Sequence, residues 1–438
     1  MKIIIPLILF MLALNITPTM AQGRTDIESA SIAVEKMLDQ DGQISIIKFM
    51  DRYMVTVNDR KAMIEKIEEI RKELLGLRDG IGLDLDTEGA ILTFASESAE
   101  KRLRIKYNKQ VQRITNLFIL PTEEKLKFDI DNLGAAIQYM KDQDMAGLIY
   151  LKSKGEIVIN EPFGMANKNL GIPNSIETIF AIGSRPIDFT KAAILLLDQE
   201  DSLSLEDPLG LHLNNVPVDK QTIKLKHLMS GKSGLPDFFD NEKDWDPDLQ
   251  WVSRSEAIQR MLKQTLLFEP GKGYSHSHGA FGLLAAIVEL RTGKTYMEYL
   301  KENFFDPAGM TRTGEYGEQK DLEIKDFAVG GGPQFIGLPN IPPNWGPTSW
   351  LIKGSGGMYS TVGDLLKFYS LVRNGEVFDT DHAKYFNVSS VDIDGSMRGF
   401  ELFSAYNPPE SEMFLFLNNS GEVDLRRKVF RALEDLIH

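Results

Sequence analysis

The chain has 438 residues, of which 49 are lysine or arginine and 63 are aspartate or glutamate, so its formal net charge is −14. This acidic balance argues against partners held by general electrostatics, such as nucleic acids or anionic membrane surfaces. A hydrophobic share of 42% and a charged share of 26% are typical of a folded protein. The length suggests two or three domains, or one large and one small. The lack of cysteine excludes disulfides, thiolate zinc sites and a cysteine nucleophile.

The first 21 residues have the pattern of a signal peptide. Lys2 precedes an apolar run over residues 3–14, and small residues lead to Ala21. A run of about 12 residues is too short to span a bilayer, which needs roughly 20. We therefore predict cleavage after Ala21 and an exported protein, periplasmic or secreted, with an uncleaved N-terminal anchor as the alternative. No later stretch approaches a spanning length, so no stable membrane anchor is predicted.

Residues 22–121 are predicted to form a small α+β domain. Two segments, 27–38 and 60–75, carry apolar residues at helical spacing, and a glycine-rich turn follows. Three later segments then alternate as strands do, at residues 90–94, 101–107 and 112–118. This region holds no histidine, so we assign it no chemistry. Pro121 and the charged residues after it are the predicted linker.

Residues 128–438 are predicted to form a second, larger α+β domain. Hairpins near its two ends flank a helical middle, which indicates one antiparallel sheet covered by helices and interrupted by a helical insertion. Helices are predicted over residues 133–141, 189–198, 223–229, 281–292, 362–372 and 423–437, and strands over residues 146–151, 156–159, 400–406 and 412–418.

Ser184 is the first candidate for chemistry because it follows Gly183 directly before a predicted helix. A serine at a helix start lies where backbone N–H groups and the positive helix end favour a developing oxyanion. The alternative is that Ser184 only caps the helix.

Five segments recur in one order along the chain, and together they identify a family. They are FAIGSRPIDFT at 180–190, SGKSGLP at 230–236, EPG to FFDPAGM over 269–310, GGMYSTVGDL at 356–365 and GSMRGF at 395–400. From about Asn132 to His438 the chain resembles the serine β-lactamase and penicillin-binding protein superfamily, in its esterase and D-aminopeptidase-like branch. The resemblance implies an antiparallel sheet flanked by helices and a serine nucleophile that forms an acyl-enzyme.

The charged motifs of that superfamily are degenerate here. In S-x-x-K, Ser184 keeps the nucleophile but Ile187 stands at the lysine position. Counting from Pro-Gly places His276 at the family's tyrosine and His278 at its asparagine. In the last strand, Ile393 replaces the usual lysine or histidine, and Gly395 is retained. Another register, with a two-residue insertion, makes Tyr274 the tyrosine.

Two hypotheses follow from these departures. In the first, His276 faces Ser184 as the general base and Asp188 orients one of the histidines, giving a serine hydrolase for a small ester or amide. In the second, the site is dead and the protein is a pseudoenzyme that binds a ligand in the inherited cleft. Penicillin hydrolysis is a weaker third prospect, because the charged anchors for the β-lactam carboxylate are missing.

Further residues are candidates for substrate binding or metal ligation. Arg398 and Arg185 could bind a substrate carboxylate, and Trp345 lies in a proline-rich stretch predicted to rim the cleft. The pair His276 and His278 could ligate zinc, but the sequence places no third ligand, so no metal is predicted. No nucleotide-binding or Ca²⁺-loop motif stands out, so no cofactor is predicted either.

Overall fold

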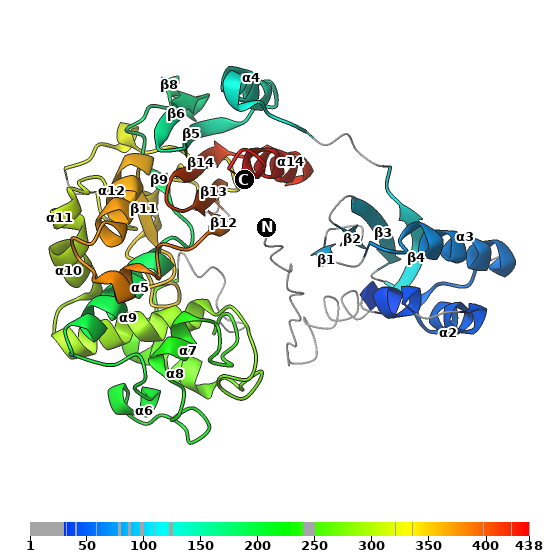
Figure 1. The fold of residues 1–438 in the computed structure, drawn as a ribbon, viewed down its shortest axis with the longest axis horizontal. Coiled ribbons are helices and arrows are strands. Elements are labelled where there is room, and N and C mark those ends of the chain that lie inside the picture. The colour runs from blue at the N-terminus through cyan, green and yellow to red at the C-terminus, as the bar shows by residue number, and fades with distance from the viewer. Residues whose placement is uncertain are drawn as a thin grey trace. The chain divides into compact units, whose positions relative to one another are not determined.

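The computed structural model describes residues 30–437 except 32, 40–41, 58, 78–79, 86–88, 97–99, 109, 122–125, 240–249, 320, 335, 397 and 422. The chain divides into two compact units, Met1–Glu124 and Lys125–His438 (Figure 1). The predicted signal peptide lies outside the described residues. None of the helices in the described ranges is long and apolar enough to cross a membrane.

The first unit contains helices and a four-stranded antiparallel sheet in which consecutive strands pair. Helix α3 covers most of the predicted segment 60–75, whereas α2 and β1 were not predicted. The glycines of β1 made it read as a turn, but its backbone pairs along its whole length with β2. The elements are α2 (Gln43–Tyr53), α3 (Arg60–Glu73), β1 (Gly80–Leu85), β2 (Gly89–Ala95), β3 (Glu100–Asn108) and β4 (Arg113–Ile119).

The second unit is built on a five-stranded antiparallel sheet of order β12-β13-β14-β5-β6. Strands from the two ends of the unit meet at its centre, because β14 pairs with β5. This arrangement confirms the prediction of one sheet made from flanking hairpins. The strands are β5 (Ala146–Ser153), β6 (Glu156–Phe163), β12 (Ser390–Ser396), β13 (Phe400–Asn407) and β14 (Ser411–Asn419).

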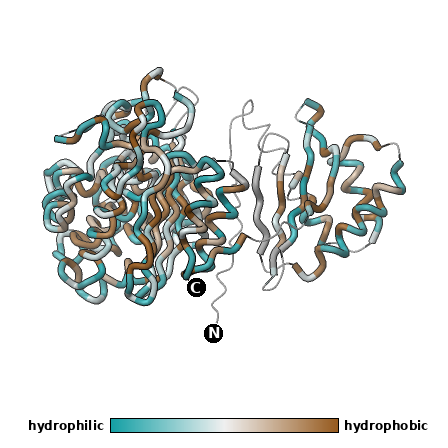
Figure 2. The backbone as a smooth tube through the Cα atoms, turned by 90° about the horizontal axis from the view of Figure 1, so that it is seen from above, coloured by the Kyte–Doolittle hydropathy of each residue, from teal (hydrophilic) through white to brown (hydrophobic). Residues whose placement is uncertain are grey.

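Both faces of this sheet are buried. In β14, Phe414 and Phe416 pack toward the large helical core, while Met413 and Leu415 pack toward α4 (Leu133–Asp142) and α14 (Val423–Glu434). Side chains alternate between faces along a strand, so two covered faces need a continuous apolar run. Figure 2 shows hydrophobic residues gathered along these strands and hydrophilic residues on the outer loops.

Two long helices lie at the centre of the helical part of this unit. Helix α5 (Pro186–Gln199) and helix α9 (His278–Thr292) pack against each other, and most residues of both are buried. The other elements are β7 (Met165–Asn167), β8 (Ile172–Pro173), β9 (Phe180–Ala181), α6 (Leu209–His212), α7 (Leu225–Met229), α8 (Arg254–Lys263), α10 (Tyr296–Leu300), α11 (Asp306–Ala308), β10 (Gly314–Glu315), β11 (Met358–Ser360), α12 (Val362–Arg373) and α13 (Thr380–Ala383), with 3₁₀ turns at Ile130–Asn132, Ile324–Asp326 and Pro342–Trp345 and a π turn at Lys301–Phe305.

Candidate active site

Ser184 lies in the short connection between β9 and α5, pressed against the edge strand β12. Gly183 has a φ of 53°, and a Cβ there would lie 2.8 Å from the backbone nitrogen of Gly395. Only glycine fits a left-handed backbone at such close approach. Helix α5 begins after Arg185 without a side-chain cap, so the Ser184 hydroxyl is not used as an N-cap.

The start of α9 brings a second segment to this place. Ser277 caps the helix by accepting a hydrogen bond from the backbone nitrogen of Ala280 (3.1 Å). The next two backbone N–H groups, of His278 and Gly279, donate to the carboxylate and the carbonyl of Asp237 (3.0 and 2.9 Å). The first turn of a helix has unpaired N–H groups and a positive dipole end, which favour an acidic partner. These two hydrogen bonds at the start of α9 therefore hold Asp237 beside His278.

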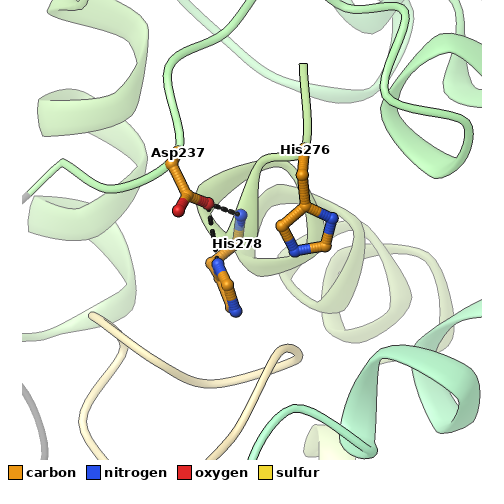
Figure 3. A group of neighbouring side chains, drawn as sticks. All are labelled: Asp237, His276 and His278. Atoms are coloured by element: carbon orange, nitrogen blue, oxygen red, sulfur yellow. Dashed lines mark hydrogen bonds and ion pairs between the residues drawn. The ribbon is translucent and has the colours of Figure 1, made fainter. Parts of the chain in front are cut away.

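These three segments form a continuous chain of hydrogen bonds between side chains. Ser184 Oγ lies 3.2 Å from Nε2 of His278. On the other side of the ring, Nδ1 of His278 lies 2.7 Å from Oδ1 of Asp237 (Figure 3). A hydroxyl, an imidazole and a carboxylate in this order are the parts of a nucleophile, its general base and the group that orients the base.

Two aromatic neighbours hold the His278 ring. Phe238 stacks on its face, with ring centroids 4.4 Å apart and planes 10° from parallel. His276 lies edge-on to it, with centroids 4.6 Å apart and planes at 84°. The ring is thus packed between Phe238 and His276, and its side chain is 18% exposed. Such packing limits the imidazole to few orientations.

The electrostatics of the group favour an ionised Asp237 beside neutral His276. Burial by itself would raise the pKa of Asp237, but the hydrogen bonds and the charge of His278 outweigh it, so the pKa is lowered. Burial, together with the charge of His278, lowers the pKa of His276 below its usual value near 6.5. At neutral pH the carboxylate is therefore charged, as an orienting group must be.

The structure places the two predicted histidines differently from the sequence. His276 was expected to face Ser184, but the hydrogen bond comes from His278, the first residue of α9, and His276 lies in the loop two residues before it. Asp237 was missed. Its signal in the sequence is an acidic residue directly after Ser-Gly-Leu-Pro, at residues 233–236.

Arg185 and Asp188 belong to a buried ionic cluster instead of the cleft. Arg185 Nε lies 2.6 Å from Oδ2 of Asp394, and Asp188 accepts hydrogen bonds from Tyr369 (2.6 Å) and Lys191 (3.1 Å). Burial would raise the pKa of Asp188, but the charges of Lys191 and Arg185 hold it well below its usual range. The expectations that Arg185 binds a substrate carboxylate and that Asp188 orients a histidine are therefore wrong.

Two further predicted binding residues are inaccessible to a substrate. Arg398 is 1% exposed and Trp345 is 3% exposed. The guanidinium of Arg398 lies over the indole of Trp345, 5.8 Å from the ring centroid, so each side chain covers the other. The 3₁₀ turn at Pro342–Trp345 carries the indole into the core, not to a rim. Gly395 is exposed on β12 and lies beside Gly183, so it is next to the turn that carries Ser184.

The family assignment follows from comparison with known proteins. The Beta-lactamase family matches residues 134–392, which is more than half of the chain. The protein belongs to this family. It is 24% identical over 357 residues to PbpX of Bacillus subtilis, a match that covers 77% of this chain and 88% of that protein. It is 30% identical over 191 residues to a D-aminopeptidase of Brucella anthropi, covering 42% of this chain and 36% of that protein.

A solved structure shows the same fold. The octameric penicillin-binding protein homologue from Pyrococcus abyssi superposes with a TM-score of 0.58 at 24% identity, covering 70% of this chain and 77% of that one. Members of the family include serine hydrolases that act on small amides and esters. The β-lactamase/transpeptidase fold expected from the sequence is thereby confirmed.

At two positions where the β-lactamase family carries a charged residue, this chain has Ile187 and Ile393, so neither position supplies a charge near Ser184. Ile187, at the family's lysine position, packs in the helical core and is 9% exposed. Ile393, at the position of the strand cation, is 61% exposed on β12. Lys191, two helical turns after Ser184, is paired with Asp188. Among the described residues, the hydrogen bond to the Ser184 hydroxyl comes from His278.

Proposed function

We propose that the protein is an exported serine hydrolase that cleaves a small ester or amide through Ser184. In this proposal His278 is the general base and Asp237 orients it. The observation that carries the proposal is the unbroken chain of side-chain hydrogen bonds from Ser184 through His278 to Asp237. Imidazole is a better proton acceptor at neutral pH than the unperturbed lysine that it replaces.

The geometry supports an acyl-enzyme cycle. Nε2 of His278 takes the hydroxyl proton as Ser184 Oγ attacks the carbonyl carbon, and the ring then gives this proton to the departing alcohol or amine. A water molecule, deprotonated by the same nitrogen, attacks the acyl-serine. The ring then returns this proton to Ser184 Oγ as the acyl–oxygen bond breaks, which releases the acid and the free enzyme. In this proposal the positive dipole end of α5 and the backbone of the edge strand β12 beside Gly395 stabilise the oxyanion, because the N–H groups of Arg185, Ile187 and Asp188 are already bonded within the turn.

The substrate class and the export proposal rest on separate observations. The relative from Brucella anthropi is named a D-aminopeptidase, which supports an amide or ester of a small D-amino acid as the first substrate to assay. Phe238 beside His278 is 40% exposed and offers an apolar wall for a small acyl group. Export rests on the apolar run at residues 3–14 after Lys2.

Covalent labelling tests the proposal most directly. The purified protein is treated with a fluorophosphonate and its intact mass is measured, with Ser184→Ala as the control. We expect one phosphonyl adduct that the control lacks, together with hydrolysis of p-nitrophenyl acetate or D-alanine p-nitroanilide that requires Ser184.

A folded protein that neither labels nor turns over either compound would contradict the proposal and favour a ligand-binding pseudoenzyme. The protein is also incubated with a penicillin. A penicillin adduct on Ser184 that is released slowly would show instead that the protein acts like the family members that bind penicillin.

A further inference from the structure

Asp237, His276 and His278 together form a set of metal-ligating groups. One ligand atom from each residue lies within 4.8 Å of the other two, and Figure 3 shows the two rings beside the carboxylate. It is the one such group of three found among the described residues. Two imidazole nitrogens and a carboxylate oxygen are donors that zinc and its neighbours in the first transition row prefer.

Of these three residues, His276 has no role in the proposed mechanism. Its ring lies perpendicular to that of His278 and is partly exposed, and it comes from the loop that leads into α9. A histidine with a purely structural role needs no second histidine and no carboxylate within reach. The placement of His276 is accounted for if the three side chains share an ion.

We propose that Asp237, His276 and His278 bind a single divalent ion of the zinc class, and that this ion inhibits the hydrolase reversibly. The inhibitory part rests on the proposed function. His278 has two ring nitrogens, one hydrogen-bonded to Asp237 and the other to Ser184. If Nε2 coordinates the ion, the hydrogen bond to Ser184 is lost. If Nδ1 coordinates it, the bond to Asp237 is lost and the neutral ring carries its proton on Nε2, which then cannot accept one from Ser184. In either case the ion and the base cannot act together.

The site is accessible, and small side-chain movements would let it hold the ion. The side chains of His278 and Asp237 are 18% and 34% exposed, which leaves an entry path from solvent. Bonds of about 2.1 Å to a tetrahedral ion separate its ligands by about 3.4 Å, and the present ligand atoms all lie within 4.8 Å of one another. Three protein ligands leave the fourth position to water.

A cobalt titration of the full-length, untagged chain tests the site without reference to activity. Because the protein has no cysteine, the visible Co²⁺ bands report nitrogen and oxygen ligands alone. We expect saturation at one equivalent, displacement by Zn²⁺, and at least a tenfold weaker affinity in His276→Ala. The matched control is His382→Ala, which removes a histidine held by Asp198 and Asp379 elsewhere in the fold and keeps the affinity.

Labelling of Ser184 by the fluorophosphonate tests the inhibition. We expect Zn²⁺ to slow labelling, EDTA to restore it, and His276→Ala to require at least tenfold more Zn²⁺ for the same effect. Absence of saturable binding, or binding that His276→Ala does not weaken, overturns the site. Labelling that needs the metal and is abolished by EDTA overturns the inhibitory role. A chain that binds Co²⁺ but never labels overturns the proposed function, and the inhibition with it, while the site stands.

Discussion

Ser184 and Arg185 are neighbours in one turn, yet they belong to two clusters of opposite character. Ser184 faces His278 and Asp237, whose side chains stay in reach of solvent at 18% and 34% exposure. Arg185 turns inward to Asp394, and these side chains are 9% and 6% exposed. The first cluster keeps hydrogen bonds that can rearrange during a reaction, whereas the second joins α5 to β12 behind the nucleophile.

The comparison shows how little a residue's charge says about its role. Arg185 and Asp188 are the ionisable residues nearest to Ser184 in sequence, yet the charge of each is paired with opposite charges inside the protein. A buried charge without a partner is costly, so such partners are needed for folding. Substitutions in the two clusters should therefore have separable effects, on turnover in one and on stability in the other.

The largest separation is expected between two aspartates. Asp237→Asn should lower kcat by about 10³- to 10⁴-fold, because the amide cannot hold the imidazole in the required tautomer. Initial rates with p-nitrophenyl acetate measure the loss, and thermal unfolding should change little. Asp188→Asn is the matched control, since it removes the same charge from the buried cluster and should lower Tm. Comparable kcat values for the two variants would refute the division of roles.

Removal of Arg185 should be the most damaging change to stability. Arg185→Met leaves Asp394 buried without its cation, which costs about 3–5 kcal/mol in the free energy of unfolding. Urea unfolding followed by circular dichroism measures this cost. The double variant Arg185→Met/Asp394→Leu removes both charges and should recover much of the loss. A double variant no more stable than the single one would mean that shape, and not charge, dominates here.

Phe238 should have a moderate effect on turnover alone. Phe238→Ala removes the ring stacked on His278, an interaction worth about 0.5–1.5 kcal/mol, so kcat should fall by about two- to tenfold. Phe238→Tyr keeps the stacked ring and should retain the rate. Stopped-flow labelling of Ser184 would separate the two variants. Equal rates in both would show that stacking does not position the base.

A pH-dependent effect of small size is expected at His382, away from both clusters. Burial would lower its pKa, but hydrogen bonds to Asp198 and Asp379 raise it above the usual value near 6.5. Its stabilising contribution is thus fully present below pH 6.5 and is lost as the pH rises through the raised value. His382→Gln should cost about 0.5–1 kcal/mol at pH 5.5 and less at pH 8.5. Urea unfolding at both pH values checks this, and an equal cost at both would contradict it.

Much of the fold was determined by local sequence patterns. Polar and apolar faces at helical spacing marked α5, α9 and α12, and strand patterns marked β5 and β14. Such patterns depend on near neighbours in the chain, so they can be read without the structure. Ser184 needed more than its local pattern, because a glycine before a serine at a helix start also fits an N-cap, and the family resemblance of five segments singled it out.

Tertiary structure decided which ionisable residues meet. Asp237 and His278 are 41 residues apart and come together because the start of α9 takes its capping carboxylate from another loop. That contact also selects His278 over His276. Arg185 is buried because Asp394 and Tyr369, far along the chain, neutralise and bond it. Side-chain direction and the cost of burying charge depend on partners that are distant in sequence, so no local pattern could assign them.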